Sequence, residues 1–425
     1  MTSTEPVATR AWVLHPDISG QDAARDPARA LEEAVALGEA LPGLEIVGSE
    51  IVRLPRPHPR ALFGSGKIEE LKARLEVNEV GLVLIDGPVT PVQQRNLEKA
   101  WGCKLLDRTG LILEIFSDRA ATREGVLQVE MAALSYQRTR LVRAWTHLER
   151  QRGGLGFVGG PGETQIEADR RAIDDQLVRL RRQLEKVVKT RTLHRASRAK
   201  VPCPIVALVG YTNAGKSTLF NRLTGSDVMV KDMLFATLDP TMRKVSLPHG
   251  GPDVILSDTV GFISDLPTEL VAAFRATLEE VVSADLIVHV RDISHPETEE
   301  QAADVETILE GLDVNEATPR LEVWNKADLL SPEDAETRHT LAERREDVVL
   351  LSAITGAGLA EFVERATDAL TAAQVEITLT LGFDEGRKRA WLYDQGIVEA
   401  ERQGEHGWEF DVRWTVRQAG AFEAL

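Results

Sequence analysis

One loop sequence in the central part of the chain indicates its type of fold: Gly210-Tyr211-Thr212-Asn213-Ala214-Gly215-Lys216-Ser217. It fits the pattern GxxxxGK[ST] in full, follows the apolar run Ile205–Val209 and precedes a helical pattern over Thr218–Leu223. In a loop of this kind the backbone N–H groups wrap phosphates, Lys216 reaches the β and γ phosphates, and the Ser217 hydroxyl binds Mg²⁺. The sequence therefore predicts a P-loop nucleotide-binding domain.

A second motif, Asp258-Thr259-Val260-Gly261, follows the apolar run Val254–Leu256 and lies 42 positions after Lys216 (258 minus 216). An Asp at a strand end can hold Mg²⁺ through a water molecule. The backbone N–H of the glycine can then meet the γ-phosphate of a nucleoside triphosphate. The order and the spacing of the two motifs support one shared site.

The segment between these motifs contains Phe235-Ala236-Thr237-Leu238-Asp239. A threonine here can complete the Mg²⁺ shell and sense the γ-phosphate, and Thr237 competes for this role with Thr224 and Thr241. We expect the metal ligands to be Ser217 and Thr237. We expect the catalytic groups to be Lys216, Thr237 and Gly261.

A base-recognition motif, Asn325-Lys326-Ala327-Asp328, follows the apolar run Leu321–Trp324. Guanine offers its N1–H and 2-amino groups, which the Asp328 carboxylate can accept, whereas adenine offers no such donors. We expect Asn325 to tie this loop to the phosphate loop and the Lys326 stem to cover the base. The motif predicts a preference for GTP over ATP.

A further turn, Ser352-Ala353-Ile354, follows the apolar run Val348–Leu351 and would present backbone N–H groups to guanine O6. These five motifs stand in the order of a guanine-nucleotide switch domain. By contrast, Phe63-Gly64-Ser65-Gly66-Lys67 is an imperfect match, because Ala61 stands where the first glycine belongs and Ile68 replaces the Ser or Thr. We interpret that stretch as a turn before a helix.

The alternation of apolar strands and helical patterns predicts an α/β chain of several domains, since 425 residues exceed one ordinary domain. Expected strands and helices in the first part are Trp12–Leu14, a helix around Ala23–Leu41, Glu45–Leu54, a helix over Ile68–Leu75, Gly81–Ile85 and a helix over Pro91–Trp101. Long helical patterns follow over Ala120–Gln151 and Glu163–Arg195. We expect an N-terminal α/β domain (1–119), a basic helical hairpin (120–197), a P-loop GTPase domain with a mostly parallel sheet (201–372) and a small C-terminal α/β domain (375–425).

Charge is distributed unevenly along the chain. The net charge is −17, yet Ser135–Lys200 carries 13 Arg and 3 Lys against 7 acidic residues, a net of +9, which leaves −26 for the rest. The balance argues against a protein that coats nucleic acid non-specifically, while the hairpin is suited to phosphates. Ten of its arginines flank the loop: Arg138, Arg140, Arg143, Arg150, Arg152, Arg170, Arg171, Arg179, Arg181 and Arg182.

The loop of the hairpin, Gly153–Gly162, holds six glycines in ten positions. It is either a flexible connector or a binding tip, and Phe157 with Val158 favours the tip. The two cysteines, Cys103 and Cys203, cannot build a disulfide framework, and no signal sequence or membrane span is evident. We expect a cytoplasmic, monomeric protein without stable membrane insertion.

In these motifs the chain resembles the HflX family of ribosome-associated GTPases. The resemblance rests on GYTNAGKS, FATLDPT, DTVGF and NKAD, and equally on LFGSGKIEEL, RTGLILEIFSDRA and GGLGFVGGPGETQIEADRR. It implies binding of the large ribosomal subunit through its RNA, splitting or rescue of stalled ribosomes, and a hairpin tip that reaches toward the peptidyl-transferase region. We expect no DNA partner.

Phe262 stands where Ras-type GTPases place the glutamine that orients the attacking water. Because a phenyl ring cannot polarise water, we expect slow intrinsic hydrolysis that a partner raises. Asn213 leaves two interpretations open: a ligand of an activating K⁺, or a loop-stabilising hydrogen bond. Two other functions also stay open, a GTP-dependent ribosome assembly or RNA-maturation factor and a nucleotide-controlled protein scaffold.

Overall fold

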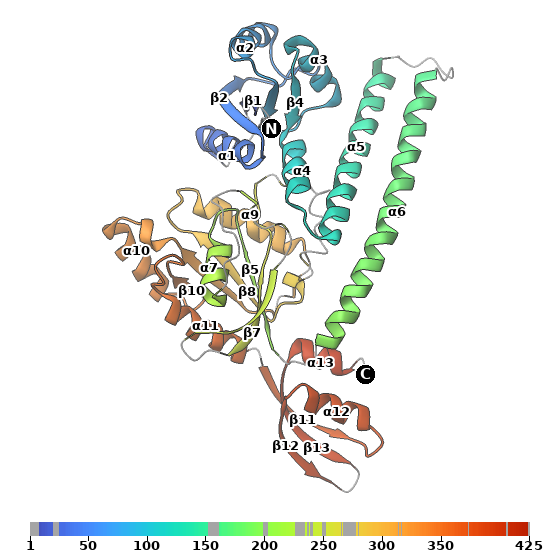
Figure 1. Ribbon diagram of the computed structural model, residues 1–425. Helices are drawn as coiled ribbons and strands as arrows, with labels where there is room; N and C mark the ends of the chain where they lie inside the picture. Colours follow the sequence, from blue (N-terminus) through green and yellow to red (C-terminus); the bar gives the residue numbers. More distant parts are fainter. Residues whose placement is uncertain are drawn as a thin grey trace, which may run out of the picture. The chain divides into compact units, whose positions relative to one another are not determined.

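The computed structural model describes residues 8–19, 25–151, 161–198, 203–225, 234, 235, 238, 241–248, 252–264, 266, 278, 280–312, 314, 315, 317–372, 374–404 and 407–423. These residues fold into two compact units (Figure 1). The first unit comprises Met1–Val187, Lys231–Leu238 and Asp265–Phe274, and the second comprises Val188–Val230, Asp239–Ser264 and Arg275–Leu425. The first unit thus includes a few described residues of the central sequence, among them Phe235 and Leu238.

The first unit is built on a parallel sheet with the strand order β2-β1-β3-β4. Its elements are β1 (Thr9–Ile18), α1 (Pro27–Ala40), β2 (Leu44–Leu54), α2 (Ser65–Val77), β3 (Leu82–Ile85), α3 (Pro91–Trp101), β4 (Lys104–Asp107), α4 (Arg108–Arg119), α5 (Arg123–Gln151) and the first part of α6 (Pro161–Arg198). All four residues of β3 are buried, as its continuous apolar run predicts for a central parallel strand.

Local sequence signals set the helix limits in this unit. Helix α1 begins four residues later than the apolar pattern suggests, because Asp26 caps it and Pro27 occupies its first turn. Helix α3 has the predicted limits, with a capping box between Thr90 and Gln93. The imperfect phosphate-loop match is a turn into α2, and Lys67 is ion-paired with Glu50 and Glu70 there.

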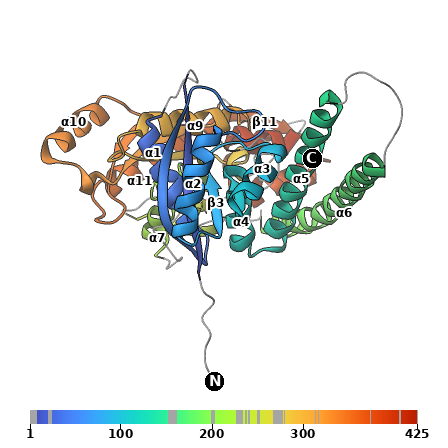
Figure 2. The same cartoon turned by 90° about the horizontal axis from the view of Figure 1, so that it is seen from above.

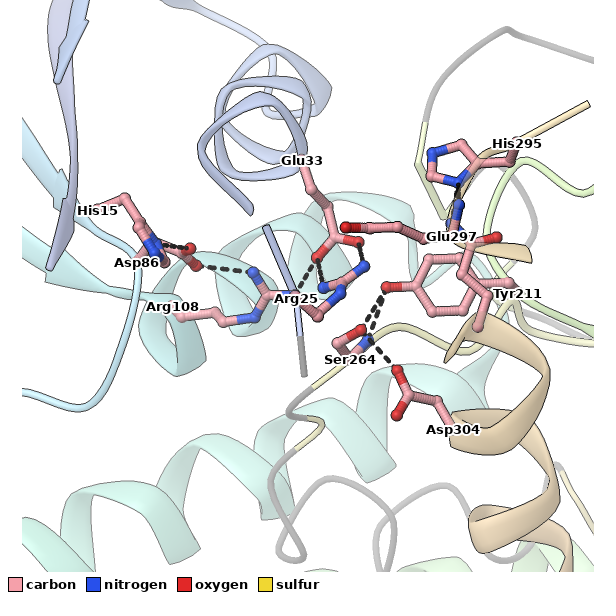
Figure 3. Close-up of polar contacts among 11 residues, drawn as sticks. His15, Arg25, Glu33, Asp86, Arg108, Tyr211, Ser264, His295, Glu297 and Asp304 are labelled. Carbon is pink, nitrogen blue, oxygen red and sulfur yellow. Dashed lines mark hydrogen bonds and ion pairs between the residues drawn. The ribbon is translucent and has the colours of Figure 1, made fainter. Parts of the chain in front are cut away.

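A buried ion network lies past the carboxyl ends of β3 and β4 (Figure 3). Arg108 donates to Asp86 at 2.7 Å and also binds Glu33, while the His15 ring nitrogen lies 2.8 Å from the second Asp86 oxygen. Burial alone would raise the pKa of Asp86, but His15 and Arg108 together lower it. Glu33, on α1, and Asp86, after β3, are thus joined through the Arg108 guanidinium.

Helices α5 and α6 form the predicted hairpin, side by side in Figure 1 and seen from above in Figure 2. Arg138 and Asp174 form an ion pair at 2.8 Å, and Gln176 donates to Glu130 at 3.3 Å. The two contacts run in opposite order along α5 and α6, as in an antiparallel pair. Leu177 and Leu180, three positions apart on α6, are buried. The Gly153–Gly162 loop lies almost wholly outside the described residues.

The second unit contains the GTPase-type sheet, with the strand order β10-β9-β8-β5-β7-β6. All its pairings are parallel except that of β6 with β7, which is antiparallel. The elements are β5 (Ile205–Gly210), α7 (Lys216–Thr224), β6 (Thr241–Ser246), β7 (Asp253–Asp258), β8 (Leu286–Asp292), α9 (Thr298–Glu310), β9 (Arg320–Asn325), η1 (Ala327–Leu329), α10 (Pro332–Glu343), β10 (Val348–Leu350) and α11 (Leu359–Ala372). Alternating helices and parallel strands confirm the predicted fold class.

The C-terminal part of the second unit is a three-stranded antiparallel sheet in the order β11-β13-β12. Its elements are β11 (Gln374–Leu381), α12 (Gly386–Asp394), β12 (Val398–Gln403), β13 (Trp408–Thr415) and α13 (Val416–Glu423). Strands and helices are both present here, as expected for a small α/β domain. No helix in the described part of the chain is long and apolar enough to cross a membrane.

Candidate functional site

Four predicted motifs meet at one edge of the central sheet. The phosphate loop follows β5, the Asp258 motif ends β7, and the Asn325 motif ends β9. Because these strands are parallel and lie within one sheet, their carboxyl ends point to the same edge. Ser352 follows β10 at that edge as well. The topology thus brings together segments that are up to 142 positions apart in the chain (352 minus 210).

Two glycines allow the backbone of the loops to approach closely. Gly215 has φ +94°, and a Cβ there would lie 2.1 Å from Nδ2 of Asn325. At Gly261 a Cβ would lie 2.9 Å from Thr212 Cα and 3.1 Å from Nζ of Lys216. Any larger residue at either position would push the base loop or the Asp258 segment away from the phosphate loop.

Lys216 opens α7 and is almost fully buried. Its ammonium group donates to the carbonyl oxygens of Gly210 at 3.1 Å and Tyr211 at 2.8 Å. Burial lowers the pKa of Lys216 to about 8, against the opposing effect of the Asp258 carboxylate. A cation held by two neutral carbonyls is poised to exchange them for phosphate oxygens.

The predicted magnesium residues Ser217 and Asp258 lie side by side. The Ser217 hydroxyl donates to Oδ2 of Asp258 at 2.7 Å, and Asp258 is 1% exposed. A hydroxyl and a carboxylate are the hard oxygen donors that Mg²⁺ takes together with phosphates and water. No group of three or more His, Cys, Asp or Glu side chains is placed to hold a metal ion among the described residues. The donor set therefore suits an ion that arrives with phosphates.

The base-recognition loop is joined to the phosphate loop as predicted. Asn325 is 2% exposed; its Nδ2 donates to the Ala214 carbonyl at 2.9 Å and its Oδ1 accepts from Ala353 N–H at 3.0 Å. The Lys326 ammonium pairs with Asp292 at 2.8 Å, which fixes the aliphatic stem of Lys326 beside the loop. Asp328 lies exposed in η1, and its carboxylate contacts no charged or hydrogen-bonding partner among the described residues.

The turn after β10 has fewer unpaired backbone N–H groups than the three that the sequence predicted as donors to guanine O6. The Ser352 N–H donates to the Ala357 carbonyl, and the Ala353 N–H is taken by Asn325. Of the three N–H groups proposed for guanine O6, that of Ile354 alone has no partner within the described residues. Ile354 is also 68% exposed. Among these three residues, Ile354 is therefore the one whose N–H is free of hydrogen bonds to other described residues.

Phe262 is held by the phosphate loop through its backbone. Its N–H donates to the Gly210 carbonyl at 3.1 Å, and its carbonyl accepts from the Thr212 N–H at 2.7 Å. The ring is 3% exposed. Thr259 is anchored likewise, since its hydroxyl donates to the Leu208 carbonyl of β5 at 2.6 Å. The Asp258 segment is therefore attached to β5 and to the loop on both sides of Gly261.

Phe235 and Leu238, predicted near the phosphates, are both buried and belong to the first unit. The Phe235 ring packs edge-to-face on Phe116 of α4, with 4.7 Å between ring centroids and an interplanar angle of 78°. Ala236, Thr237 and Asp239 lie outside the described residues. The Phe235 side chain is thus used for packing in the N-terminal unit.

The two threonines that compete with Thr237 have other roles in the described structure. Thr224 ends α7, and its hydroxyl donates to the Phe220 carbonyl at 2.8 Å. Thr241 begins β6 and pairs with Asp258 in the antiparallel ladder. Thr224 is therefore committed to its helix, whereas Thr241 is beside the site.

The arginines of the hairpin fall into two groups. Arg140 pairs with Asp107 at 3.0 Å, in a cluster completed by the Tyr136 hydroxyl, and Arg138 pairs with Asp174. These two side chains join the hairpin to itself and to β4, so Arg140 in particular is not available to RNA. Exposed arginines on α6 are Arg170, Arg171, Arg179, Arg181 and Arg182. Of these, Arg170 also pairs with Asp174 at 4.0 Å and Arg171 with Glu167 at 3.6 Å. The side chains of Arg143, Arg150 and Arg152 lie outside the described residues.

Three polar residues that sequence reasoning missed contact the predicted motifs. Asp292, at the end of β8, holds Lys326. Ser264 and Asp304 form a hydrogen-bonded chain with the Tyr211 hydroxyl, which Figure 3 shows. The position of Asp292 at the end of a buried strand is the signal that could have identified it. Ser264 and Asp304 carry no comparable signal.

A phosphate loop tied by an asparagine to a guanine-type recognition loop, at the carboxyl edge of a mostly parallel sheet, defines the P-loop GTPases. Comparison with known proteins agrees with this class over most of the chain. Residues 28–117 match the family described as "GTP-binding GTPase N-terminal", and residues 119–198 its "Middle Region". Residues 205–326 match "50S ribosome-binding GTPase", and residues 339–424 match "HflX C-terminal domain".

Curated relatives extend over almost the whole chain. The GTPase HflX of Magnetococcus marinus is 50% identical over 379 residues, which is 89% of this chain and 86% of that protein. The GTPase HflX of Escherichia coli is 47% identical over 352 residues, covering 83% and 82%. That of Caldanaerobacter subterraneus is 40% identical over 414 residues, covering 94% of each. The chain belongs to the HflX family and hydrolyses GTP.

Proposed function

We propose that this GTPase binds the large ribosomal subunit, hydrolyses GTP in a ribosome-stimulated way, and splits or rescues stalled ribosomes. The observation that carries the proposal is the match of residues 205–326 to the "50S ribosome-binding GTPase" family. The exposed arginines of α6 add independent support, because side chains of this kind can neutralise RNA phosphates on an otherwise acidic chain. The nucleotide site serves as the switch, and the hairpin serves as the contact to ribosomal RNA.

In this proposal each motif binds one part of GTP. Lys216 and the loop N–H groups hold the β and γ phosphates, and Gly261 N–H meets the γ-phosphate. Asp328 accepts from guanine N1–H and the 2-amino group, and Ile354 N–H donates to O6. Ser217, Thr237 and, through water, Asp258 hold Mg²⁺, which would neutralise the charge of the phosphates.

Asn213 is proposed to ligate an activating K⁺. It lies exposed in the phosphate loop at φ +59°, and its amide makes no hydrogen bond to any other described residue. The alternative interpretation, a loop-stabilising hydrogen bond, therefore lacks support in this part of the chain. A bound K⁺ would add positive charge near the phosphates. Equal turnover in K⁺ and Na⁺ at matched ionic strength would contradict this assignment.

Basal hydrolysis is expected to be slow, because Phe262 is buried and cannot orient water. Large ribosomal subunits should raise the rate at least tenfold, equivalent to about 1.4 kcal/mol of the barrier. Phe262→Ala should not simply abolish the basal rate, whereas Lys216→Ala or Ser217→Ala should. A fast basal rate without any partner would contradict the proposal.

The alternative function is a GTP-dependent ribosome assembly or RNA-maturation factor that uses the same hairpin. The two are separated by measuring GTP turnover with intact large subunits, with 70S ribosomes and with free ribosomal RNA. Stimulation by subunits and 70S ribosomes, with release of subunits from 70S, supports the first function. Stimulation by free RNA alone supports the alternative. Co-sedimentation with large subunits only in the presence of a GTP analogue tests the switch itself.

We further propose a cytoplasmic monomer built of the four segments 1–119, 120–197, 201–372 and 375–425. Deletion of Gly154–Gly160 should leave GTP binding intact and weaken ribosome-stimulated turnover. If the deletion variant responds to ribosomes like the parent, the loop is only a connector. Sedimentation equilibrium with and without nucleotide measures the oligomeric state.

A further inference from the structure

The phosphate loop carries a buried tyrosine, Tyr211, whose hydroxyl is hydrogen-bonded to the segment after Gly261. Tyr211 is 4% exposed, and its hydroxyl lies 2.7 Å from the Ser264 hydroxyl. The Ser264 N–H donates to the same Tyr211 oxygen at 2.9 Å. The Ser264 hydroxyl in turn donates to Oδ2 of Asp304 on α9 at 2.7 Å. Figure 3 shows the three side chains converging.

The direction of each hydrogen bond follows from the acceptor at the end of the chain. The Asp304 carboxylate can only accept, so the Ser264 hydroxyl donates its one proton to that carboxylate. The Tyr211 O–H must then donate to the Ser264 oxygen, while the Tyr211 oxygen accepts from the Ser264 N–H. Both polar groups of Ser264 are thereby fixed by Tyr211 and Asp304.

The hydrogen bonds among Tyr211, Ser264 and Asp304 hold the segment that follows Gly261. Phe262 is already bonded to the phosphate loop through its own N–H and carbonyl. The Tyr211–Ser264 bonds add a third and a fourth link within three residues. Ser264 is also the last residue of the second unit before the polypeptide enters the first unit at Asp265.

We propose that Tyr211 is a positioning residue for GTP hydrolysis: through Ser264 and Asp304 it fixes the backbone of Gly261 at the place of the γ-phosphate. The inference rests on the proposed contact between Gly261 N–H and that phosphate. GDP lacks the γ-phosphate, so the binding of GDP should not depend on the Tyr211–Ser264–Asp304 hydrogen bonds. Loss of the Tyr211 hydroxyl should therefore weaken the binding of a GTP analogue and slow hydrolysis while leaving GDP affinity unchanged.

The test compares Tyr211→Phe with the parent, using GDP, a non-hydrolysable GTP analogue and basal turnover without ribosomes. We expect about tenfold weaker analogue binding, an equal or larger loss of kcat, and GDP affinity within twofold. Asp304→Asn retains a carbonyl acceptor and should preserve activity, whereas Asp304→Ala should behave like Tyr211→Phe. The double variant Tyr211→Phe/Asp304→Ala should lose no more than either single variant.

A matched control on the same helix is Thr307→Ala, which removes an exposed hydroxyl that donates to the Ala303 carbonyl. It should change none of the three measurements. Equal losses of GDP and analogue affinity in Tyr211→Phe would reduce the tyrosine to a structural role and overturn the proposal. Tighter analogue binding or faster turnover would overturn it as well, because the chain would then restrain the segment in an unproductive position.

Gly261→Ala distinguishes the inference from its premise. If Gly261→Ala leaves the ratio of analogue affinity to GDP affinity as it is in the parent, the proposed γ-phosphate contact itself is wrong. If that ratio falls in Gly261→Ala but is unchanged in Tyr211→Phe, only the positioning role of Tyr211 is wrong. Urea unfolding of each variant shows whether a loss of binding reflects a loss of folded protein.

Discussion

The side-chain amide of Asn325 donates to the backbone carbonyl of Ala214 at 2.9 Å, and the asparagine is 2% exposed. One buried side chain thus connects the recognition loop for the base with the loop for the phosphates. The two halves of the nucleotide site cannot move independently while this bond exists. The same amide accepts from Ala353, so the turn after β10 is included in the connection.

Asn325→Ala should weaken GDP and GTP binding to the same degree. The substitution leaves the Ala214 carbonyl and the Ala353 N–H buried without partners, at a cost of about 1–3 kcal/mol each. We expect at least tenfold weaker binding of both nucleotides in titrations with a fluorescent analogue. Asn315→Ala, in an exposed loop where the side chain only accepts from Ala317, is the control. Selective loss of GTP would be inconsistent with a shared scaffold.

Asp328→Asn should change the preferred base from guanine to xanthine. The amide replaces a pair of acceptors with a donor that suits the C2 carbonyl of xanthine. GTP binding should lose on the order of 2–4 kcal/mol. Competition between GTP and XTP for a fluorescent nucleotide measures the change. Asp334→Asn, at the start of α10 nearby, should leave the preference unaltered; an unchanged GTP affinity in Asp328→Asn would mean that the base binds elsewhere.

Lys216 should make the nucleotide-free protein more stable as the pH rises above 8. Burial lowers the pKa of Lys216 to about 8, whereas a lysine in an unfolded chain titrates near 10.4. Between these values the unfolded chain binds more protons, so the free energy of unfolding increases with pH by at most about 1.4 kcal/mol per unit. Below pH 8 both states are protonated and the buried charge is a constant cost.

Urea unfolding of the nucleotide-free parent and of Lys216→Met, from pH 7 to 9.5, tests this dependence. Lys216→Met removes the buried charge and should be the more stable protein at pH 7. The difference between the two should shrink as the pH rises from 8 to 9.5. Parallel curves for the two proteins would show that Lys216 keeps an ordinary pKa in the folded state.

Arg179, Arg181 and Arg182 should contribute to the salt dependence of binding to large ribosomal subunits. Each arginine that contacts a phosphate releases counterions, so each replacement by Gln should lower the slope of log K against log salt by about one. Arg140→Gln is the control, because Arg140 is paired with Asp107. It should reduce the stability of the N-terminal unit without changing the slope. Unchanged slopes in all variants would mean that these α6 arginines face solvent and do not contact RNA phosphates.

The fold and most of the nucleotide site could be predicted because their signals are local. Apolar runs define the parallel strands, and the turn after each strand carries its own motif. The edge strand β6 was missed because its sequence, Thr241–Ser246, is mostly polar and only partly buried. A strand that lies at the edge of a sheet needs little apolar surface.

Contacts between distant polar side chains could not be predicted in the same way. The sequence identifies Tyr211 as a loop residue but contains no sign that Ser264 and Asp304 meet its hydroxyl. It likewise gives Arg138 and Arg140 the same basic character as Arg179, although the fold pairs the first two with aspartates. Such assignments depend on tertiary distances, which no local pattern encodes.

The pairing of Phe235 with Phe116 has a practical consequence for dissecting the protein. A fragment cut at 201 and 372 would follow the sequence motifs but would separate Phe235 from the ring that covers it. The excised piece would present a phenyl side chain to water, next to the segment that contains Thr237. Such a fragment would expose an apolar ring that is covered in the whole chain, so the central domain is better studied in a protein that also contains α4.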